Sequence, residues 1–124
     1  MPVSWHLDAG FVFLESDEAA TFDEWKEAVA AALLAAHTEF GADIAVVHDL
    51  RRMRRVPALR EAHARMALLV RRSRTFGVKR WASVVGSAEN LAMAETAEVF
   101  AAGEPVEFRI FTDLAKAEAW VRGR

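Results

Sequence analysis

The 124-residue chain contains no cysteine and no tyrosine, and it has no long apolar run. Without cysteine it can form no disulfide bond, zinc–thiolate site or thiol nucleophile. Its longest apolar stretch, Ala28 to Ala36, is far shorter than the roughly 20 residues that span a membrane. The first residues have neither the basic nor the apolar region of a signal peptide. We therefore expect a cytoplasmic protein with no membrane span.

Acidic residues are nearly absent from one segment of the chain. Eleven of the sixteen lysines and arginines lie between Arg51 and Arg80, where Glu61 is the only acid. Residues 1–50 hold ten acids and one base, so the formal net charge of −2 conceals a very uneven distribution. Three interpretations are open: pairing within the molecule, a surface for a partner, or an anion site.

Turn and capping signals divide the chain into nine elements. Gly10 marks a hairpin turn, Thr21 and Glu24 form a capping box, Pro57 suits the first turn of a helix, and Ser87 is a typical N-cap. The helix after Ser87 has the least regular apolar pattern. Its inner-face candidates are Leu91, Ala94, Ala97 or Glu98, and Phe100. We expect strands near 3–7, 11–15, 44–47, 78–85 and 106–111, and helices near 21–40, 57–76, 87–102 and 113–121.

The resulting order is β-β-α-β-α-β-α-β-α. Strands that alternate with helices of this length predict an α/β fold with a five-stranded, mixed but mostly parallel sheet and four helices. The opening hairpin adds one antiparallel strand at an edge. The last strand alternates apolar and charged residues, which places it toward the other edge. No linker or repeat interrupts the chain, so residues 1–124 are predicted to form a single domain.

Three segments have a distinctive pattern. Residues 44–51 form an apolar strand that ends in Asp-Leu, and residues 79–85 form a strand that begins with two basic residues. Residues 106–120 form a tail with Phe, then Asp-Leu, then Ala-x-Ala-Trp. Together these segments resemble the SpoIIAA-like proteins, which are grouped with the STAS and Sec14-like domains. The resemblance covers essentially the whole chain and implies a SpoIIAA-like fold. It also implies a small binding or regulatory module, commonly without catalytic chemistry.

The regulatory members of that family carry a phosphorylatable serine at the start of the helix after the third strand. This sequence has no serine or threonine from Leu50 through Arg72. The resemblance therefore does not extend to a phosphate switch, and the matching loop holds arginines instead.

The arginine-rich loop is the first candidate site. It follows the carboxyl end of a central strand, where ligands of open α/β sheets bind, and it leads into a helix. Guanidinium groups there could hold a phosphate or carboxylate, with the hydroxyl of Ser87 at the neighbouring strand end. The alternative is a solvated loop whose arginines pair with nearby acids. The proposed residues for an anion or a partner are Arg51, Arg52, Arg54, Arg55 and Ser87.

The second helix is the other basic feature. We expect Arg60, Arg65, Arg71 and Arg72 to form a surface for a protein partner or a second copy of the chain. The acidic first helix should lie beside it and could neutralise part of that charge. The sequence pI of about 6.1 and the lack of interleaved aromatic residues argue against nucleic acid.

An enzyme is a weaker interpretation. His48 and Asp49 are adjacent, but in a strand their side chains point to opposite faces, and Ser87 would be needed as a nucleophile. A strand-end histidine and an N-cap serine are the simpler roles. The histidines show no metal-ligand spacing, and no phosphate-binding loop, dinucleotide-binding or nucleophile-elbow motif occurs. We expect no metal and no cofactor.

The four tryptophans leave one more alternative open. Trp5, Trp25, Trp81 and Trp120 could line an apolar pocket, or they could simply fill the core. In the first case the protein would bind a small or lipid-like ligand, and the arginines at 51–55 would clamp its anionic group. Our preferred prediction remains a non-catalytic module that contacts a protein partner or itself.

Overall fold

The computed structural model describes residues 3–8, 10–17, 21–41, 43–53 and 58–123. The predicted order of five strands and four helices is confirmed, with bounds within a few residues of those expected. The strands are β1 (Val3–Asp8), β2 (Phe11–Ser16), β3 (Ile44–Asp49), β4 (Val78–Val84) and β5 (Glu107–Phe111). The helices are α1 (Phe22–Phe40), α2 (Leu59–Phe76), α3 (Ala88–Ala101) and α4 (Leu114–Val121).

The sheet runs in the order β1-β2-β3-β4-β5. β1 is antiparallel to β2, and the other neighbouring pairs are parallel. Both edge predictions are therefore confirmed, since β1 and β5 form the two edges. β3 is buried along its whole length, as its unbroken apolar run predicts for a central strand. The parallel strands β2 to β5 all end on the same side of the sheet, which places the loop after β3 at that side.

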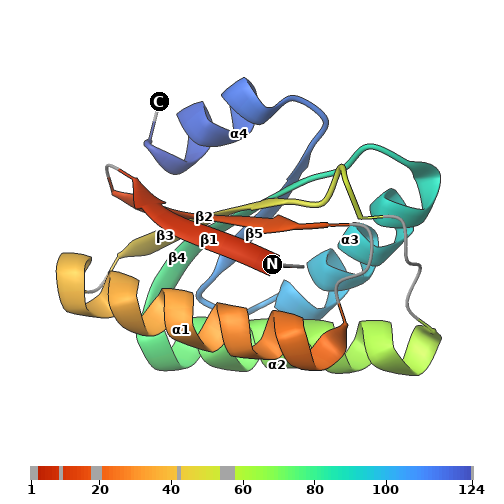
Figure 1. Cartoon of the computed structure of the whole chain (residues 1–124), viewed down its shortest axis with the longest axis horizontal. Helices are drawn as coiled ribbons and strands as arrows, with labels where there is room; N and C mark the ends of the chain where they lie inside the picture. Colours follow the sequence, from red (N-terminus) through yellow and green to blue (C-terminus); the bar gives the residue numbers. More distant parts are fainter. Residues whose placement is uncertain (1–2, 9, 18–20, 42, 54–57, 124) are drawn as a thin grey trace.

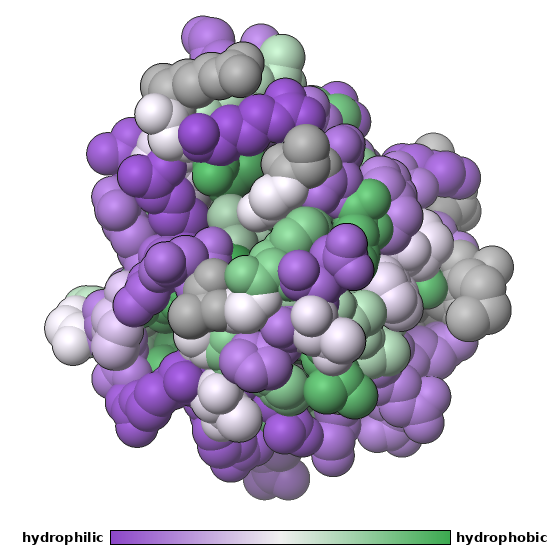
Figure 2. All heavy atoms as spheres, turned by 90° about the vertical axis from the view of Figure 1, so that its left-hand side faces the viewer, coloured by the Kyte–Doolittle hydropathy of each residue, from purple (hydrophilic) through white to green (hydrophobic). Residues whose placement is uncertain are grey.

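Helices cover the two faces of the sheet unequally. Among the described residues, α1, α2 and α3 lie on one face, where α1 and α2 run side by side, and α4 lies on the other (Figure 1). None of the helices in the described part of the chain is both long and apolar enough to cross a membrane. The end of the molecule that carries the β1–β2 turn and the chain's C-terminus has a mixed surface, with hydrophobic residues set among hydrophilic ones (Figure 2).

The helix ends follow the capping signals of the sequence. The Thr21 hydroxyl accepts the Glu24 N–H at 3.2 Å, and the Glu24 carboxylate accepts the Thr21 N–H at 3.0 Å, so the predicted capping box is confirmed. Gly77 ends α2 in the left-handed conformation, at φ 76°, where a side chain would be strained. Asp113 caps α4 by accepting the Lys116 N–H at 3.2 Å. The prediction for Pro57 lies outside the described residues.

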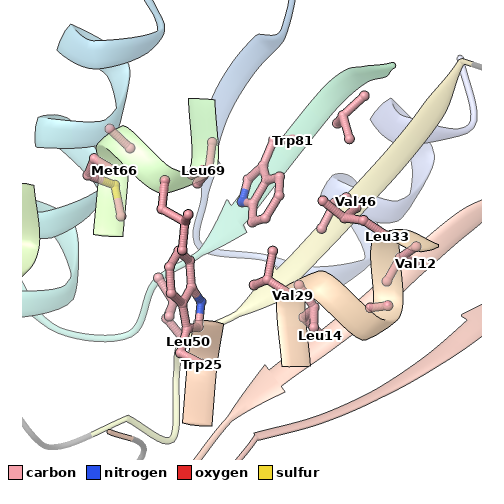
Figure 3. Close-up of a cluster of buried hydrophobic side chains, with 14 of the residues drawn as sticks. Val12, Leu14, Trp25, Val29, Leu33, Val46, Leu50, Met66, Leu69 and Trp81 are labelled. Carbon is pink, nitrogen blue, oxygen red and sulfur yellow. The ribbon is translucent and has the colours of Figure 1, made fainter. Parts of the chain in front are cut away.

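The larger hydrophobic core lies between the sheet and the three helices. Trp25 of α1, Leu69 of α2 and Trp81 of β4 lie together in it (Figure 3). The expectation for α3 was partly wrong, because Leu91 and Phe100 are exposed. The expected Ala94 and Ala97 are buried, together with Asn90, Met93 and Ala101. The three alanines are small and let α3 pack against α2 and β5.

Candidate functional site

The loop that leaves β3 begins with an ion pair between neighbours. The side chain of Arg51 donates from Nε to Asp49 Oδ1 and from Nη2 to Asp49 Oδ2, both at 2.9 Å, and its backbone N–H donates to Oδ1 at 3.1 Å. Burial alone would raise the pKa of Asp49, but the hydrogen bonds from Arg51 outweigh it and hold that pKa below its ordinary value. Much of the Arg51 charge is therefore used to shape the loop.

Backbone contacts anchor the same loop to β4 and α3. The Leu50 N–H donates to the Val84 carbonyl at 2.8 Å, and the Asn90 side chain donates to the Met53 carbonyl at 3.3 Å. A Cβ on Gly86 would lie 3.3 Å from the Arg51 side chain, so glycine allows the two segments to approach closely. These contacts hold the backbone of residues 50–53 in place at the carboxyl ends of the strands.

The predicted loop arginines differ in their exposure and in how closely they are bound to acidic side chains. Arg52 is 65% exposed and lies 3.4 Å from the Glu15 carboxylate, whereas Arg51 is bound to the buried Asp49. Arg54 and Arg55 lie outside the described residues. Ser87 is exposed, and its hydroxyl accepts the Asn90 N–H at 3.1 Å, which confirms it as the N-cap of α3.

The basic surface predicted on α2 is smaller than expected. Arg60 and Arg71 are exposed, and eleven residues of helix set them about 16 Å apart on nearly the same side. Arg72 is partly buried. Arg74, near the end of the helix, is paired with Glu104.

Arg65 was expected on that surface, and this prediction is wrong because its side chain is 1% exposed. It occupies the inner face of α2, one turn from Ala62 and Leu69. Its guanidinium lies 3.0 Å from Glu61 one turn earlier and 5.4 Å from the centre of the Trp25 ring. A buried charge is stable only when paired in this way. Arg65 therefore belongs to the core.

His48 is the second polar group in that core. Its Nε2 lies 2.9 Å from the Ser16 hydroxyl, and the centre of its ring lies 6.4 Å from that of Trp25 and 6.1 Å from that of Trp81. Burial, and next the positive charge of Arg65, lower the pKa of His48 to about 3, although Asp49 opposes the shift. The imidazole is therefore neutral at physiological pH.

The three residues of the enzyme hypothesis are not assembled into one site. His48 bonds to Ser16, Asp49 bonds to Arg51, and Ser87 caps α3. The serine that does meet His48 is completely buried, so a substrate could not reach its hydroxyl. The geometry gives His48 a structural role.

The cavity beside His48 is very small. It measures about 10 Å³ and is lined on its polar side by His48, Arg65 and Ser83. That volume suits one water molecule, whereas a pocket for a drug-sized ligand has on the order of 300 Å³ or more.

The four tryptophans do not share a pocket either. Trp25 and Trp81 are buried in the core, Trp5 lies on the outer strand β1, and Trp120 packs on the other face of the sheet under Arg80 and Arg109. The described residues therefore do not bring the four tryptophans together in one pocket, and the lipid-like ligand stays a prediction.

One prediction concerns the loop. Arg51→Ala leaves the buried Asp49 carboxylate without its guanidinium, so we expect the free energy of unfolding at pH 7 to fall by about 1–2 kcal/mol. Arg52→Ala is the matched control, because this exposed arginine should contribute less than about 0.5 kcal/mol. Urea denaturation of both variants gives the comparison. Equal losses would show that the Asp49–Arg51 pair does not hold the loop.

Sequence reasoning missed Ser16, Glu61 and Asn90 as partners in the polar network. The Glu61–Arg65 pair could have been found, because the two residues are one helical turn apart and Arg65 lies within the apolar stripe of α2. Ser16 and His48 are 32 residues apart, and no local signal joins them.

Within the described part of the chain, no three histidine, aspartate or glutamate side chains are grouped to hold a metal ion. The chain was also compared with known proteins. No protein-family model, curated protein or solved structure matches it.

Proposed function

We propose that this protein is a non-catalytic binding or regulatory module of the STAS-like type. It contacts a protein partner, or a second copy of itself, through a basic surface made of Arg52, Arg60, Arg71 and Arg72, at the carboxyl end of β3 and along α2. The observation that carries the proposal is the contrast between exposed and engaged groups. His48 and Asp49 are engaged inside the molecule, while Arg60 and Arg71 form no ion pair with the described residues.

The chemistry of this surface favours an acidic protein over nucleic acid. Three of the four arginines are spaced along α2, and Trp81 of β4 is buried and cannot stack on bases. Glu61 lies in the same helix and reduces its net charge. Spaced guanidinium groups suit carboxylates on a folded partner, with an association rate that falls as salt is added.

The test reverses charge on the basic surface. We expect the Arg60→Glu/Arg71→Glu variant to fold normally, because both side chains are exposed, and to lose self-association or partner binding at low salt. Light scattering at low and high salt gives the oligomeric state, and affinity capture followed by mass spectrometry compares the bound proteins.

The matched control is Lys26→Glu/Lys116→Glu, which makes the same change in net charge at exposed positions of α1 and α4. If both double variants lose the same interactions, net charge rather than this surface is responsible, and if Arg60→Glu/Arg71→Glu keeps its interactions, the surface is not the contact. Either result would show that the proposal is wrong.

A further inference from the structure

The outer edge of the sheet at β1 is open. β1 is hydrogen-bonded to β2 on one side, and no strand in the described ranges borders its other side. In Figure 1, β1 is the front strand of the sheet, and α1 runs below it. Alternate residues of such a strand direct backbone N–H and C=O groups away from their partner, where they are available to another strand.

A groove runs between this edge and α1. It has a volume of about 510 Å³ and is lined on one side by Val3, Ser4 and Trp5 and on the other by Glu24, Glu27 and Ala28. Trp5 is 37% exposed, which is unusual for a residue of this size. The groove therefore combines an open backbone edge, an apolar floor and a rim that carries two carboxylates.

We propose that this groove binds an extended segment of a partner protein that carries both basic and apolar side chains on the same face. Such a segment would pair with β1 as a sixth strand, which is a common mode of peptide recognition. Its side chains on the α1 side would fill the groove, where a valine packs against Ala28 and an arginine reaches Glu27 or stacks on the indole of Trp5.

The charge of the rim selects the occupant. A second copy of the chain joined by a twofold axis through β1 would bring the two acidic rims together, because the same patch faces itself in such an interface. Like charges at close range oppose that arrangement. A basic segment is attracted instead. This surface is acidic and lies on α1 and β1, so it is separate from the basic surface of α2.

The test uses a synthetic peptide whose sequence is chosen to match the groove. The probe is a fluorescently labelled peptide of about eight residues, long enough to pair with β1. Threonine at every second position alternates with arginine at the ends and valine in the middle. We expect binding that weakens with salt, with NMR shift changes confined to residues 3–8 and the facing side of α1. A control peptide with glutamate in place of arginine should not bind.

Variants locate the site. We expect Glu27→Lys to raise the dissociation constant for the arginine peptide about tenfold, and the matched control Glu95→Lys, at an exposed position of α3, to leave it unchanged. The proposal is wrong if the two variants have equal effects on the dissociation constant. It is also wrong if NMR shift changes lie outside β1 and α1, or if the glutamate peptide binds as well as the arginine peptide. A dimer that Glu27→Lys dissociates would also overturn it, since a second copy would then occupy the groove.

Discussion

Replacing Arg65 with alanine is expected to lower the free energy of unfolding by about 3 kcal/mol or more. The substitution removes a side chain that is 1% exposed, together with its contact with the Trp25 ring and its ion pair with Glu61. It also enlarges the small cavity that Arg65 already lines. Lost packing and a larger cavity in a core cost about 2–5 kcal/mol for side chains of this size. Urea denaturation at pH 7 measures the change.

Arg65→Met separates the packing of this residue from its charge. Methionine keeps most of the length of the side chain without its charge, and the Glu61 carboxylate, which loses this partner, is 19% exposed and can be solvated by water. We therefore expect Arg65→Met to lose less than about 1.5 kcal/mol. Arg60→Ala, on the exposed side of the same helix, should change the free energy of unfolding by less than about 0.5 kcal/mol. If Arg65→Ala and Arg60→Ala lower the free energy of unfolding by the same amount, Arg65 is not part of the core.

Arg65 also illustrates which features of the fold can be predicted from the sequence. The capping box at Thr21, the glycine at the end of α2 and the N-cap Ser87 are local signals, and each marks an element that the structure contains. The unbroken apolar run of β3 and the alternation in β5 predict a central and an edge strand because burial follows the pleat of the sheet. These signals act within a few residues of the chain.

The errors arise where burial overrides residue type. An arginine is usually a surface residue, so Arg65 was assigned to the basic surface although its helical position lies within the apolar stripe. Its burial depends on Glu61 and on Trp25, which comes from another helix. α3 is a similar case, because alanines and a methionine face the core while Leu91 and Phe100 face outward. Tertiary packing decides such positions, and the hydrophobicity of single residues does not.

The groove at β1 also depends on tertiary packing. The sequence predicts β1 as an edge strand, and the acids of α1 are visible in it. The groove exists only because Trp5 and Glu27 are brought together by the packing of α1 beside the hairpin. A site built from two elements in this way has no motif of its own.

The free energy of unfolding is expected to fall as the pH is lowered, over a pH range set by the titration of His48. The pKa of His48 is lowered to about 3 in the folded protein, while in an unfolded chain the imidazole has its ordinary pKa of 6.5. Above pH 6.5 the residue is neutral in both states and has no effect. Between those two values the unfolded state binds one more proton, so the free energy of unfolding falls as the pH falls. The loss is up to about 1.4 kcal/mol per pH unit, and a few kcal/mol in all.

Chemical denaturation at a series of pH values between 4.5 and 8 measures this slope. His48→Gln keeps a polar partner for Ser16 but does not titrate, so the slope contributed by His48 should disappear in that variant. Asp49 does not interfere in this range, since its pKa lies below its ordinary value and its protonation weakens the fold only at lower pH. If the free energy of unfolding depends on pH in the same way in the wild type and in His48→Gln, His48 is not buried as a neutral group.

Arg65→Met gives an independent check, because the two core residues are coupled. The positive charge of Arg65 is the second cause of the lowered pKa of His48, after burial. Without that charge the imidazolium is less unfavourable in the folded state, so the pKa of His48 should rise toward 6.5. The acid loss of stability should then level off at a higher pH than in the wild type. NMR titration of the His48 ring signals follows the shift directly. An unchanged pKa in Arg65→Met would mean that burial alone keeps His48 neutral.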